Sequence, residues 1–414
     1  SAKMHDMEIG DSLKAIGRAG AGVNNIPLKQ MSDKGVVVFN TPGANANAVK
    51  ELVISSMLLA SRNICQAWEY VNKLPLENLK ATVEDGKKQY SGSELPGKTL
   101  GIVGLGAIGV EIANAASMLG MDVIGYDPSI SKKNAWKISS EVQEALSLEE
   151  LFSKSDFVSF HVPLVDATKN LLDAKRIALL PEGCVVINMS RDGIVDEEEL
   201  IKSLDSGKVK YYVTDFPIDE KKNHDRVIAL PHLGASTSEA EENCAIMIAK
   251  QVKDYLEHGN IVNSVNFPDS KMPRAGEERL AITHRNVPNM VRQITKEIAE
   301  EGANIVDMLN KSRGDYAYTL IDIENEIPNT VIENIQLGNS VVVSNIPEHT
   351  DLLGTDYPYL QNSLEDKDEF IRLVEDALKN RLNNTKILSF AKKKLKKMTA
   401  KSVTKEYKLI FNQF

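Results

Sequence analysis

Three residues that could carry acid–base chemistry follow apolar runs typical of strands. They are Arg191, Glu220 and His232. Oxidation of a 2-hydroxy acid needs a cation to hold the carboxylate, a base to take the hydroxyl proton, and a partner that orients the base. Because the carboxyl ends of strands in a doubly wound sheet meet at the ligand crevice, we predict that these side chains form one catalytic site. Asp219 stands beside Glu220, and either carboxylate could be the partner that orients His232. Each residue alone also has a structural explanation, a helix cap for the arginine and a hydrogen-bonded loop position for the histidine.

A glycine-rich turn lies between an apolar strand at 99–104 and a helix that runs to Gly120. In such a turn the first glycine permits the tight bend, the second lets the backbone approach a pyrophosphate, and the third lets the helix pack on the strand. The helix N-terminus attracts the phosphates. The glycine pattern alone often arises by chance, but its place between strand and helix makes it specific. The turn therefore predicts dinucleotide binding at Gly104, Gly106, Ala107, Ile108 and Gly109.

Asp127 ends the next strand, where the adenine ribose of a bound dinucleotide would lie. Its carboxylate would accept hydrogen bonds from the ribose hydroxyls and would repel a 2′-phosphate, and no arginine follows it to favour NADP. The sequence therefore predicts NAD as the cofactor. An aspartate before a proline also starts turns, which is the structural alternative.

The order of predicted elements indicates an α/β protein. Residues 97–250 alternate strands and helices, which predicts a Rossmann-type doubly wound parallel sheet that binds NAD. Residues 1–70 contain two predicted strands and a long helix. Two strands make a poor domain, so we expect a partial, flavodoxin-like substrate domain whose opening is missing and which residues 259–268 close.

The last third of the chain changes pattern. Residues 278–345 follow the order βαββαβ, which predicts a small ferredoxin-like module. Residues 346–414 are polar, helical in pattern and rich in lysine, most densely at 391–397. We interpret this lysine run as a solvated helix face and not as a nucleic-acid contact.

Composition limits the kinds of partner. The chain has 414 residues, 58 acidic and 49 basic side chains, and a formal net charge of −9. This balance argues against nucleic acid or an anionic membrane and favours a small-molecule ligand. Three cysteines without paired spacing predict neither a disulfide framework nor a metal site, and they favour a reducing cytoplasm. No apolar run approaches the roughly 20 residues that span a bilayer.

These motifs together resemble the D-2-hydroxy-acid dehydrogenase family, over residues 1 to about 325. The resemblance implies that Arg191 grips the substrate carboxylate and that His232 accepts the hydroxyl proton, while Glu220 orients the imidazole. The chain departs from the family at Asp192, which stands where the family usually has glycine.

Further segments are similar to the family's binding elements. The loop at 20–25 resembles the substrate loop, whose backbone amides meet the carboxylate, and the turn at 45–47 resembles its companion. The segment after the fourth strand resembles one that lies along the cofactor. The resemblance therefore implies substrate contacts at Ala21, Gly22, Val23 and Asn45, and cofactor contacts at His161, Val162, Pro163 and Asp215.

The linker after Lys87 is similar to that of phosphoglycerate-specific members of the family. Lys87, Lys88 and Arg18 supply the cations that a substrate phosphate needs, although exposed lysines are usually only solvated. The resemblance thus implies oxidation of 3-phosphoglycerate in serine biosynthesis by a homodimer or a higher homo-oligomer. Two alternative functions are left open: the oxidation of another D-2-hydroxy acid, and the sensing of serine by a catalytically impaired chain.

The predicted module at 278–345 resembles an ACT domain, an amino-acid-binding module attached to many such dehydrogenases. His284, Asn286 and Asn304 match its ligand positions, so the resemblance implies serine as an effector. The two asparagines could equally be turn residues. Asn289 stands where these modules often have glycine.

The sequence after about residue 329 also resembles the C-terminal part of a GT-B glycosyltransferase. The two glutamates that hold the sugar nucleotide in that fold would be Glu326 and Glu333. They lie one residue closer together than in that family, and the rest of its fold is absent from the sequence. We therefore expect a remnant or fusion without transferase activity.

Overall fold

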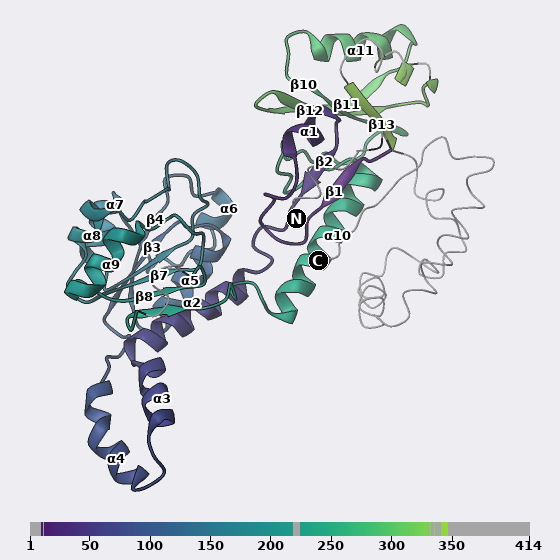
Figure 1. The fold of residues 1–414 in the computed structure, drawn as a ribbon. Coiled ribbons are helices and arrows are strands. Elements are labelled where there is room, and N and C mark those ends of the chain that lie inside the picture. The colour runs from purple at the N-terminus through teal and green to yellow at the C-terminus, as the bar shows by residue number, and fades with distance from the viewer. Residues whose placement is uncertain are drawn as a thin grey trace. The chain divides into compact units, whose positions relative to one another are not determined.

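The structure, a computed structural model, describes residues 10, 12–217, 224–329, 331–332, 335 and 341–346. The chain divides into two compact units, Gly43–Asn243, here the central unit, and Ser1–Pro42 with Cys244–Phe414, here the split unit. Figure 1 shows their elements. None of the described helices combines the length and apolar character that a membrane crossing requires. The tail at 346–414 and its predicted glycosyltransferase resemblance lie almost entirely outside the described residues.

The central unit is built on a seven-stranded sheet in the order β5-β4-β3-β6-β7-β8-β9. Every neighbouring pair of strands is parallel. The chain winds outward from β3 in one direction and then from β6 in the other, so the switch point lies between these two strands. The predicted doubly wound sheet is confirmed. Its strands are β3 (Thr99–Val103), β4 (Asp122–Tyr126), β5 (Gln143–Glu144), β6 (Phe157–Phe160), β7 (Cys184–Asn188), β8 (Val209–Thr214) and β9 (Val227–Ala229).

Helices cover both faces of this sheet. Because both faces are buried, the strands are almost continuously apolar, and alternate residues of β7 enter different cores. Val185 and Ile187 pack in one core, and Val186 packs in the other. The covering helices are α2 (Ala46–Ser61) and α5 (Ala107–Met118) on one face, and α7 (Leu148–Lys154), α8 (Ala174–Leu179) and α9 (Glu197–Ser206) on the other. The unit also contains α6 (Lys132–Ala135), and α3 (Ile64–Lys73) and α4 (Leu79–Gly86), with the 3₁₀ turn η2 (Lys87–Tyr90), project away from the sheet in Figure 1.

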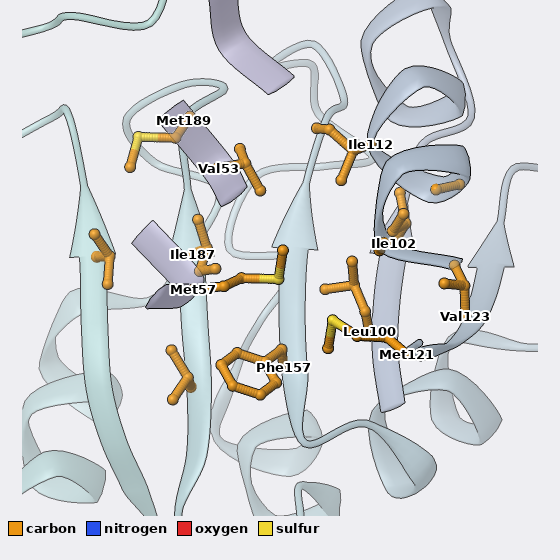
Figure 2. Close-up of a cluster of buried hydrophobic side chains, with 14 of the residues drawn as sticks. Val53, Met57, Leu100, Ile102, Ile112, Met121, Val123, Phe157, Ile187 and Met189 are labelled. Atoms are coloured by element: carbon orange, nitrogen blue, oxygen red, sulfur yellow. The ribbon is translucent and has the colours of Figure 1, made fainter. Parts of the chain in front are cut away.

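The helix α2 belongs to the central unit, although the sequence assigned residues 1–70 to the substrate domain. Val53 and Met57 of α2 pack against Leu100, Phe157 and other side chains of the sheet, as Figure 2 shows. The boundary therefore falls at Gly43, because the apolar face of α2 is buried by this sheet. Helix propensity alone cannot show which core a helix covers.

The split unit contains a parallel pair and an antiparallel sheet. The strands β1 (Ala15–Gly17) and β2 (Val37–Phe39) pair in parallel, with α1 (Leu28–Asp33) between them in sequence. The antiparallel sheet has the order β11-β12-β10-β13. Its elements are β10 (Glu278–Arg285), α11 (Met290–Glu300), β11 (Ile305–Arg313), β12 (Tyr316–Ile323) and β13 (Val341–Ile346).

The two faces of the antiparallel sheet bury different partners. Leu280 and Ile282 of β10 pack with Ile294 of α11 on one face. On the other face, Tyr318 and Leu320 of β12 pack with β2 and with α10 (Ser238–His258). The sequence treated residues 1–70 and 278–345 as separate domains, whereas these segments share a core.

A fully buried ion pair fixes the second face. Nε of Arg279 lies 2.5 Å from Oδ1 of Asp322, and its Nη2 lies 2.7 Å from Oδ2. The remaining guanidinium N–H groups donate to the carbonyls of His258, Met272 and Pro273. All five donors of the guanidinium are therefore used, which is what a buried arginine requires. The pair joins the end of α10 and the 272–275 loop to β10 and β12.

We predict that Asp322→Asn lowers the free energy of unfolding of the split unit by about 3–5 kcal/mol, because breaking a buried pair leaves an uncompensated charge. Differential scanning calorimetry should show the loss. The double variant Arg279→Met with Asp322→Leu should recover most of it.

The matched control is Glu300→Gln, which removes an exposed pair between Lys296 and Glu300 at 3.3 Å. Exposed pairs contribute about 0–1 kcal/mol, so this variant should unfold almost as the parent does. Equal small losses in Asp322→Asn and Glu300→Gln would contradict the role assigned to the buried pair.

Candidate active site

The glycine turn between β3 and α5 has a different physical reason for each glycine. Gly104 has φ +95°, and a Cβ there would lie 2.6 Å from the carbonyl oxygen of His161. A Cβ on Gly109 would lie 2.0 Å from the carbonyl oxygen of Gly104, so α5 packs directly on the turn. A Cβ on Gly106 would meet none of the described atoms within 4 Å. The turn thus leaves open space at its second glycine, where a pyrophosphate would approach.

Asp127 follows β4 and lies against this turn. Its Oδ2 accepts a hydrogen bond from the backbone N–H of Leu105 at 2.9 Å, and its Oδ1 accepts one from Ser129 at 2.8 Å. The carboxylate is therefore held at the end of the strand by the turn itself. Its predicted role at the ribose stays a prediction.

His161 follows β6 on the other side of the turn. Its Nε2 lies 2.8 Å from the hydroxyl of Ser159, and its buried Nδ1 has no hydrogen-bond partner among the described residues. Burial lowers the pKa of this imidazole to about 3, so the ring is neutral at physiological pH. Val162 also borders the turn, because its Cγ1 would lie 2.8 Å from a Cβ on Gly104. Pro163 continues the same segment.

Arg191 lies in the loop after β7 and is exposed. Its Nη1 donates to the carbonyl of Ser190 at 2.6 Å. The loop is held by Asn188, the last residue of β7, which is 1% exposed. The amide of Asn188 donates to the carbonyl of Arg191 at 2.9 Å, and its Oδ1 accepts from the backbone and hydroxyl of Ser190.

His232 follows β9 and is held by the residue that follows β8. Its backbone N–H donates to the carbonyl of Asp215 at 3.1 Å, while Gly234 donates to Oδ2 of Asp215 at 2.9 Å. The imidazole of His232 is exposed and its ring centroid lies 4.8 Å from that of Phe216. His232 also has φ +52°. Outside glycine, the described residues show such positive φ only here and at five asparagines. This sparsely populated conformation is typical of functional sites.

Asp215 connects the two loops electrostatically. Its side chain is 1% exposed, and its Oδ1 has no hydrogen-bond partner among the described residues. Burial raises the pKa of this carboxyl group above its ordinary value, and the bond from Gly234 and the nearby His232 and Arg191 side chains offset only part of this rise. The structure thus brings Arg191, His232 and Asp215 together at the carboxyl edge of the sheet. Glu220 and Asp219, the two predicted partners of His232, lie outside the described residues.

The predicted substrate loop lies in the split unit. Gly20 and Thr41 exchange two hydrogen bonds, from the Gly20 N–H to the Thr41 hydroxyl at 2.7 Å and from the Thr41 N–H to the Gly20 carbonyl at 3.1 Å. The amide of Asn40 donates to the carbonyl of Ala21 at 2.8 Å. The end of β2 therefore holds the first part of the loop, and Gly22 and Val23 follow.

The other predicted substrate residues lie in the central unit. Asn45 precedes α2 without capping it, and its buried Oδ1 has no hydrogen-bond partner among the described residues. Lys87 in η2 is exposed and forms an ion pair with Glu84. A contact between Lys87 and a phosphate would therefore compete with this pair.

The three predicted effector residues do not come together within one chain. His284 and Asn286 lie at the end of the sheet where Arg285 pairs with Tyr316. Asn304 precedes β11 and donates to Glu324 at the opposite end, where Ile305 pairs with Ile323. His284 is buried, and its ring nitrogens contact the carbonyl of Arg285 and the hydroxyl of Thr319. The strands β10 and β11 both pair antiparallel with β12, so the end of β10 and the start of β11 lie at opposite ends of the sheet. The residue pattern alone did not specify this strand order.

The residues of the central unit fit a bound dinucleotide. Gly106 offers space beside the helix N-terminus, and the buried Oδ1 of Asp215 has no donor in the part of the chain that the structure describes. An orphaned buried carboxylate oxygen is a good acceptor for a ligand amide. Among the described residues, no group of three histidine, cysteine or carboxylate side chains could hold a metal ion.

Sequence reasoning missed Asn188 and Phe216 as parts of this site. Asn188 could have been noticed as an uncharged polar residue at the end of an apolar strand, where side chains meet the ligand crevice. No signal identified Phe216, because its role depends on a ring contact across two loops.

Comparison with known proteins is consistent with this geometry. Residues 54–234 match the model of the D-isomer specific 2-hydroxyacid dehydrogenase NAD binding domain. The chain is 35% identical over 326 residues to D-3-phosphoglycerate dehydrogenase of Escherichia coli K12, which covers 76% of each chain. It is 35% identical over 312 residues to the enzyme of the same name from Methanocaldococcus jannaschii, but there it spans only 56% of the relative.

Two solved structures of related dehydrogenases have a similar fold. The NAD+-bound 3-phosphoglycerate dehydrogenase of Entamoeba histolytica aligns with TM-score 0.50 and 33% identity, over 62% of this chain and 76% of that chain. D-mandelate dehydrogenase of Rhodotorula graminis aligns with TM-score 0.57 and 27% identity, over 63% and 78%.

We predict that Gly106→Val abolishes measurable NAD binding and leaves the fold intact. Its side chain would occupy the open space of the turn, and the φ of −69° at this position suits any residue. Isothermal titration calorimetry with NAD and a thermal melt check both parts. Gly109→Ala is the matched variant, and it should lower the melting temperature because its Cβ would overlap the Gly104 carbonyl. Retained NAD affinity in Gly106→Val would show that the phosphates bind elsewhere.

Burial of neutral His161 should make the protein less stable in acid. In the unfolded chain the imidazole titrates near 6.5, so its folded pKa of about 3 means that only the unfolded state gains a proton between these values. Stability is therefore full above about pH 6.5 and is lost as the pH falls toward 3. Between pH 7 and pH 5 the loss from this group is about 2 kcal/mol. Urea unfolding should show that His161→Gln lacks this part of the pH dependence, and identical slopes would contradict the assignment.

Proposed function

Because the chain belongs to the D-isomer specific 2-hydroxyacid dehydrogenase family and carries that family's NAD-binding domain, we propose that it oxidises 3-phosphoglycerate with NAD to 3-phosphohydroxypyruvate, the first step of serine biosynthesis. The predicted family and the predicted cofactor are confirmed. The observation that carries the proposed reaction is the grouping of an exposed arginine and an exposed histidine around buried Asp215, at the same edge of the sheet as the glycine turn.

Arg191 binds the substrate carboxylate in this proposal. Its guanidinium is exposed, and one of its nitrogens, Nη1, donates a hydrogen bond to the Ser190 carbonyl. A planar guanidinium can donate two parallel hydrogen bonds to a carboxylate, which sets the orientation of the acid as well as its affinity. The substrate contacts implied at Ala21, Gly22, Val23 and Asn45 are proposed with it.

His232 takes the proton of the substrate hydroxyl. The C2–H bond breaks with its electron pair and the O–H bond breaks toward the imidazole, so that the C2–O bond becomes a carbonyl. Bound NAD would supply the acceptor for this hydride. The left-handed backbone of His232 and the Phe216 ring fix the direction of the imidazole. Glu220 or Asp219 is proposed to stabilise the protonated ring.

A phosphate contact is better supported at Arg18 than at Lys87. Arg18 precedes the substrate loop, and its buried Nε has no hydrogen-bond partner among the described residues. Lys87 already pairs with Glu84. We therefore propose Arg18 as the main cation for the phosphate, with Lys87 as the secondary one.

A regulatory role is proposed for the antiparallel sheet of the split unit. Its strand order and the helix α11 on one face are typical of a ferredoxin-like, ACT-type module. Asn289 has φ +71°, a conformation open to asparagine and glycine alike, so its departure from the family pattern is a mild one. Since His284 and Asn286 lie far from Asn304 in one chain, serine binding by all three would require a homodimer or higher homo-oligomer.

A cytoplasmic location is proposed from the three free cysteines.

The direct test is a spectrophotometric assay of NADH formation by the purified protein. 3-Phosphoglycerate with NAD should give a steady rate, and D-lactate and D-glycerate should give much lower ones. A faster rate with either unphosphorylated acid would disprove the phosphate specificity. Calorimetry with serine tests the regulatory proposal separately.

We predict that His232→Ala lowers turnover by about 10²-fold or more and leaves NAD affinity nearly unchanged, because a general base typically contributes 10²–10⁴-fold. The control is His224→Ala, which removes a histidine that contacts Asp205 in the same unit. Steady-state kinetics at saturating substrate give the comparison. If both variants retain full turnover, the base has been misassigned.

A further inference from the structure

We propose that Asn188 is the positioning residue of this site, and that it sets Arg191 directly and His232 through Thr214 and Phe216. This inference rests on the roles proposed above for Arg191 and His232. Asn188 touches neither the substrate nor the cofactor in this proposal, and it acts only through the two loops.

The side chain of Asn188 has no free hydrogen-bonding capacity. Its Oδ1 accepts from the backbone N–H of Ser190 at 3.1 Å and from the Ser190 hydroxyl at 2.9 Å. Its Nδ2 donates to the carbonyl of Arg191 at 2.9 Å and to the hydroxyl of Tyr212 at 3.4 Å. An amide has two acceptor sites and two donors, so all four are used. A flipped amide would place its oxygen against the Arg191 carbonyl, and the orientation is thereby fixed.

These bonds hold the backbone on both sides of the Arg191 side chain. The carbonyl of Ser190, which accepts from Nη1 of Arg191, belongs to the residue that Asn188 holds by two bonds. The carbonyl of Arg191 is held by the same amide. An exposed arginine would otherwise sample many rotamers, so the fixed backbone and the fixed carbonyl reduce the entropy lost when a carboxylate binds.

A second chain of contacts runs from Asn188 to His232. The backbone carbonyl of Asn188 accepts from the hydroxyl of Thr214 at 3.0 Å. The same hydroxyl accepts from the backbone N–H of Phe216 at 3.0 Å. The ring of Phe216 lies 4.8 Å from the imidazole of His232, at an interplanar angle of 56°. Thr214 is fully buried, so this path is shielded from water.

The two paths affect different kinetic constants. Loss of the Asn188 side chain releases the Arg191 loop, and the loss should appear mainly as a higher KM for the hydroxy acid. Loss of the Thr214 hydroxyl releases Phe216 and disturbs the base, and the loss should appear mainly in kcat, since a misplacement of about 1 Å can cost 10²-fold. Neither path reaches the glycine turn, so NAD affinity should change less than about twofold in both variants.

The experiment is a double-mutant cycle on the full chain. We expect both Asn188→Ala and Asn188→Asp to raise the KM for 3-phosphoglycerate about tenfold or more, because Asp keeps the two bonds from Ser190 but places an oxygen against the Arg191 carbonyl. In the Arg191→Ala background, Asn188→Ala should add almost nothing, because its effect passes through that arginine. Thr214→Val should lower kcat and shift the acidic limb of the pH profile, where the base becomes protonated, and Thr214→Ser should restore both.

The matched control is Asn114→Ala, which removes an asparagine that donates to Lys137 and accepts from Ser139 in the same unit. It should leave the KM unchanged. Additive effects of Asn188→Ala and Arg191→Ala, or equal losses of NAD affinity and melting temperature in Asn188→Ala and Asn114→Ala, would reduce Asn188 to a structural residue and overturn the proposal.

Failure of the proposed function gives a different result. A parent protein that prefers another 2-hydroxy acid disproves the phosphate specificity, and the same cycle is then measured with that acid. If no acid is oxidised, calorimetric titration of the NAD-loaded protein with oxalate still measures the affinity of the Arg191 site for a carboxylate. Equal oxalate affinity in the parent and in Asn188→Ala would then refute the positioning role.

Discussion

The parallel register of β3, β6, β7 and β8 determines where chemistry can occur in the central unit. Residues that follow parallel strands emerge at the same edge of a sheet, and here those residues are the glycine turn, His161, the Arg191 loop and Asp215. The sheet can keep this register because both of its faces are buried under helices. The polar residues at the edge are therefore held by a scaffold whose two cores consist of buried apolar side chains.

The split unit achieves order in another way. Its antiparallel sheet has one face covered by α11 and the other held against α10 and β2, and a buried ion pair stands in the second interface. A second cluster lies at the surface, where Asp33 of α1 contacts Lys29, Arg285 and Tyr316. Bonds from Lys29 and Tyr316 lower the pKa of Asp33. Charge contacts thus join the short α1 segment to a sheet that lies far away in the sequence.

The sequence was sufficient to predict the parts of the structure that follow from local periodicity. The apolar strand before the glycine turn, the helix after it and the alternating order of 97–250 all have local signals, and they were predicted. The edge strand β5, with two polar residues, has no such signal and was missed. The boundary at Gly43 depends on which core buries α2, and the separation of His284 from Asn304 depends on strand order. Neither property can be read from a window of residues.

The same limit applies to the site itself. Residue types predicted Arg191 and His232, because each chemistry needs a particular side chain. The network around Asn188 was not predicted, because it consists of side-chain bonds across neighbouring strands whose register must be known first. The pairing of Lys87 with Glu84 was missed for a similar reason, since a lysine carries no mark of whether its charge is already neutralised.

Two unfavourable features coincide at the carboxyl end of β8. Asp215 has a buried oxygen without a donor among the described residues, and His232 has a left-handed backbone. Each is unfavourable by itself, and each is maintained by the same bonds, from His232 and Gly234 to Asp215. A ligand that donates a hydrogen bond to the free oxygen removes one of these penalties and so stabilises the loop that carries the histidine.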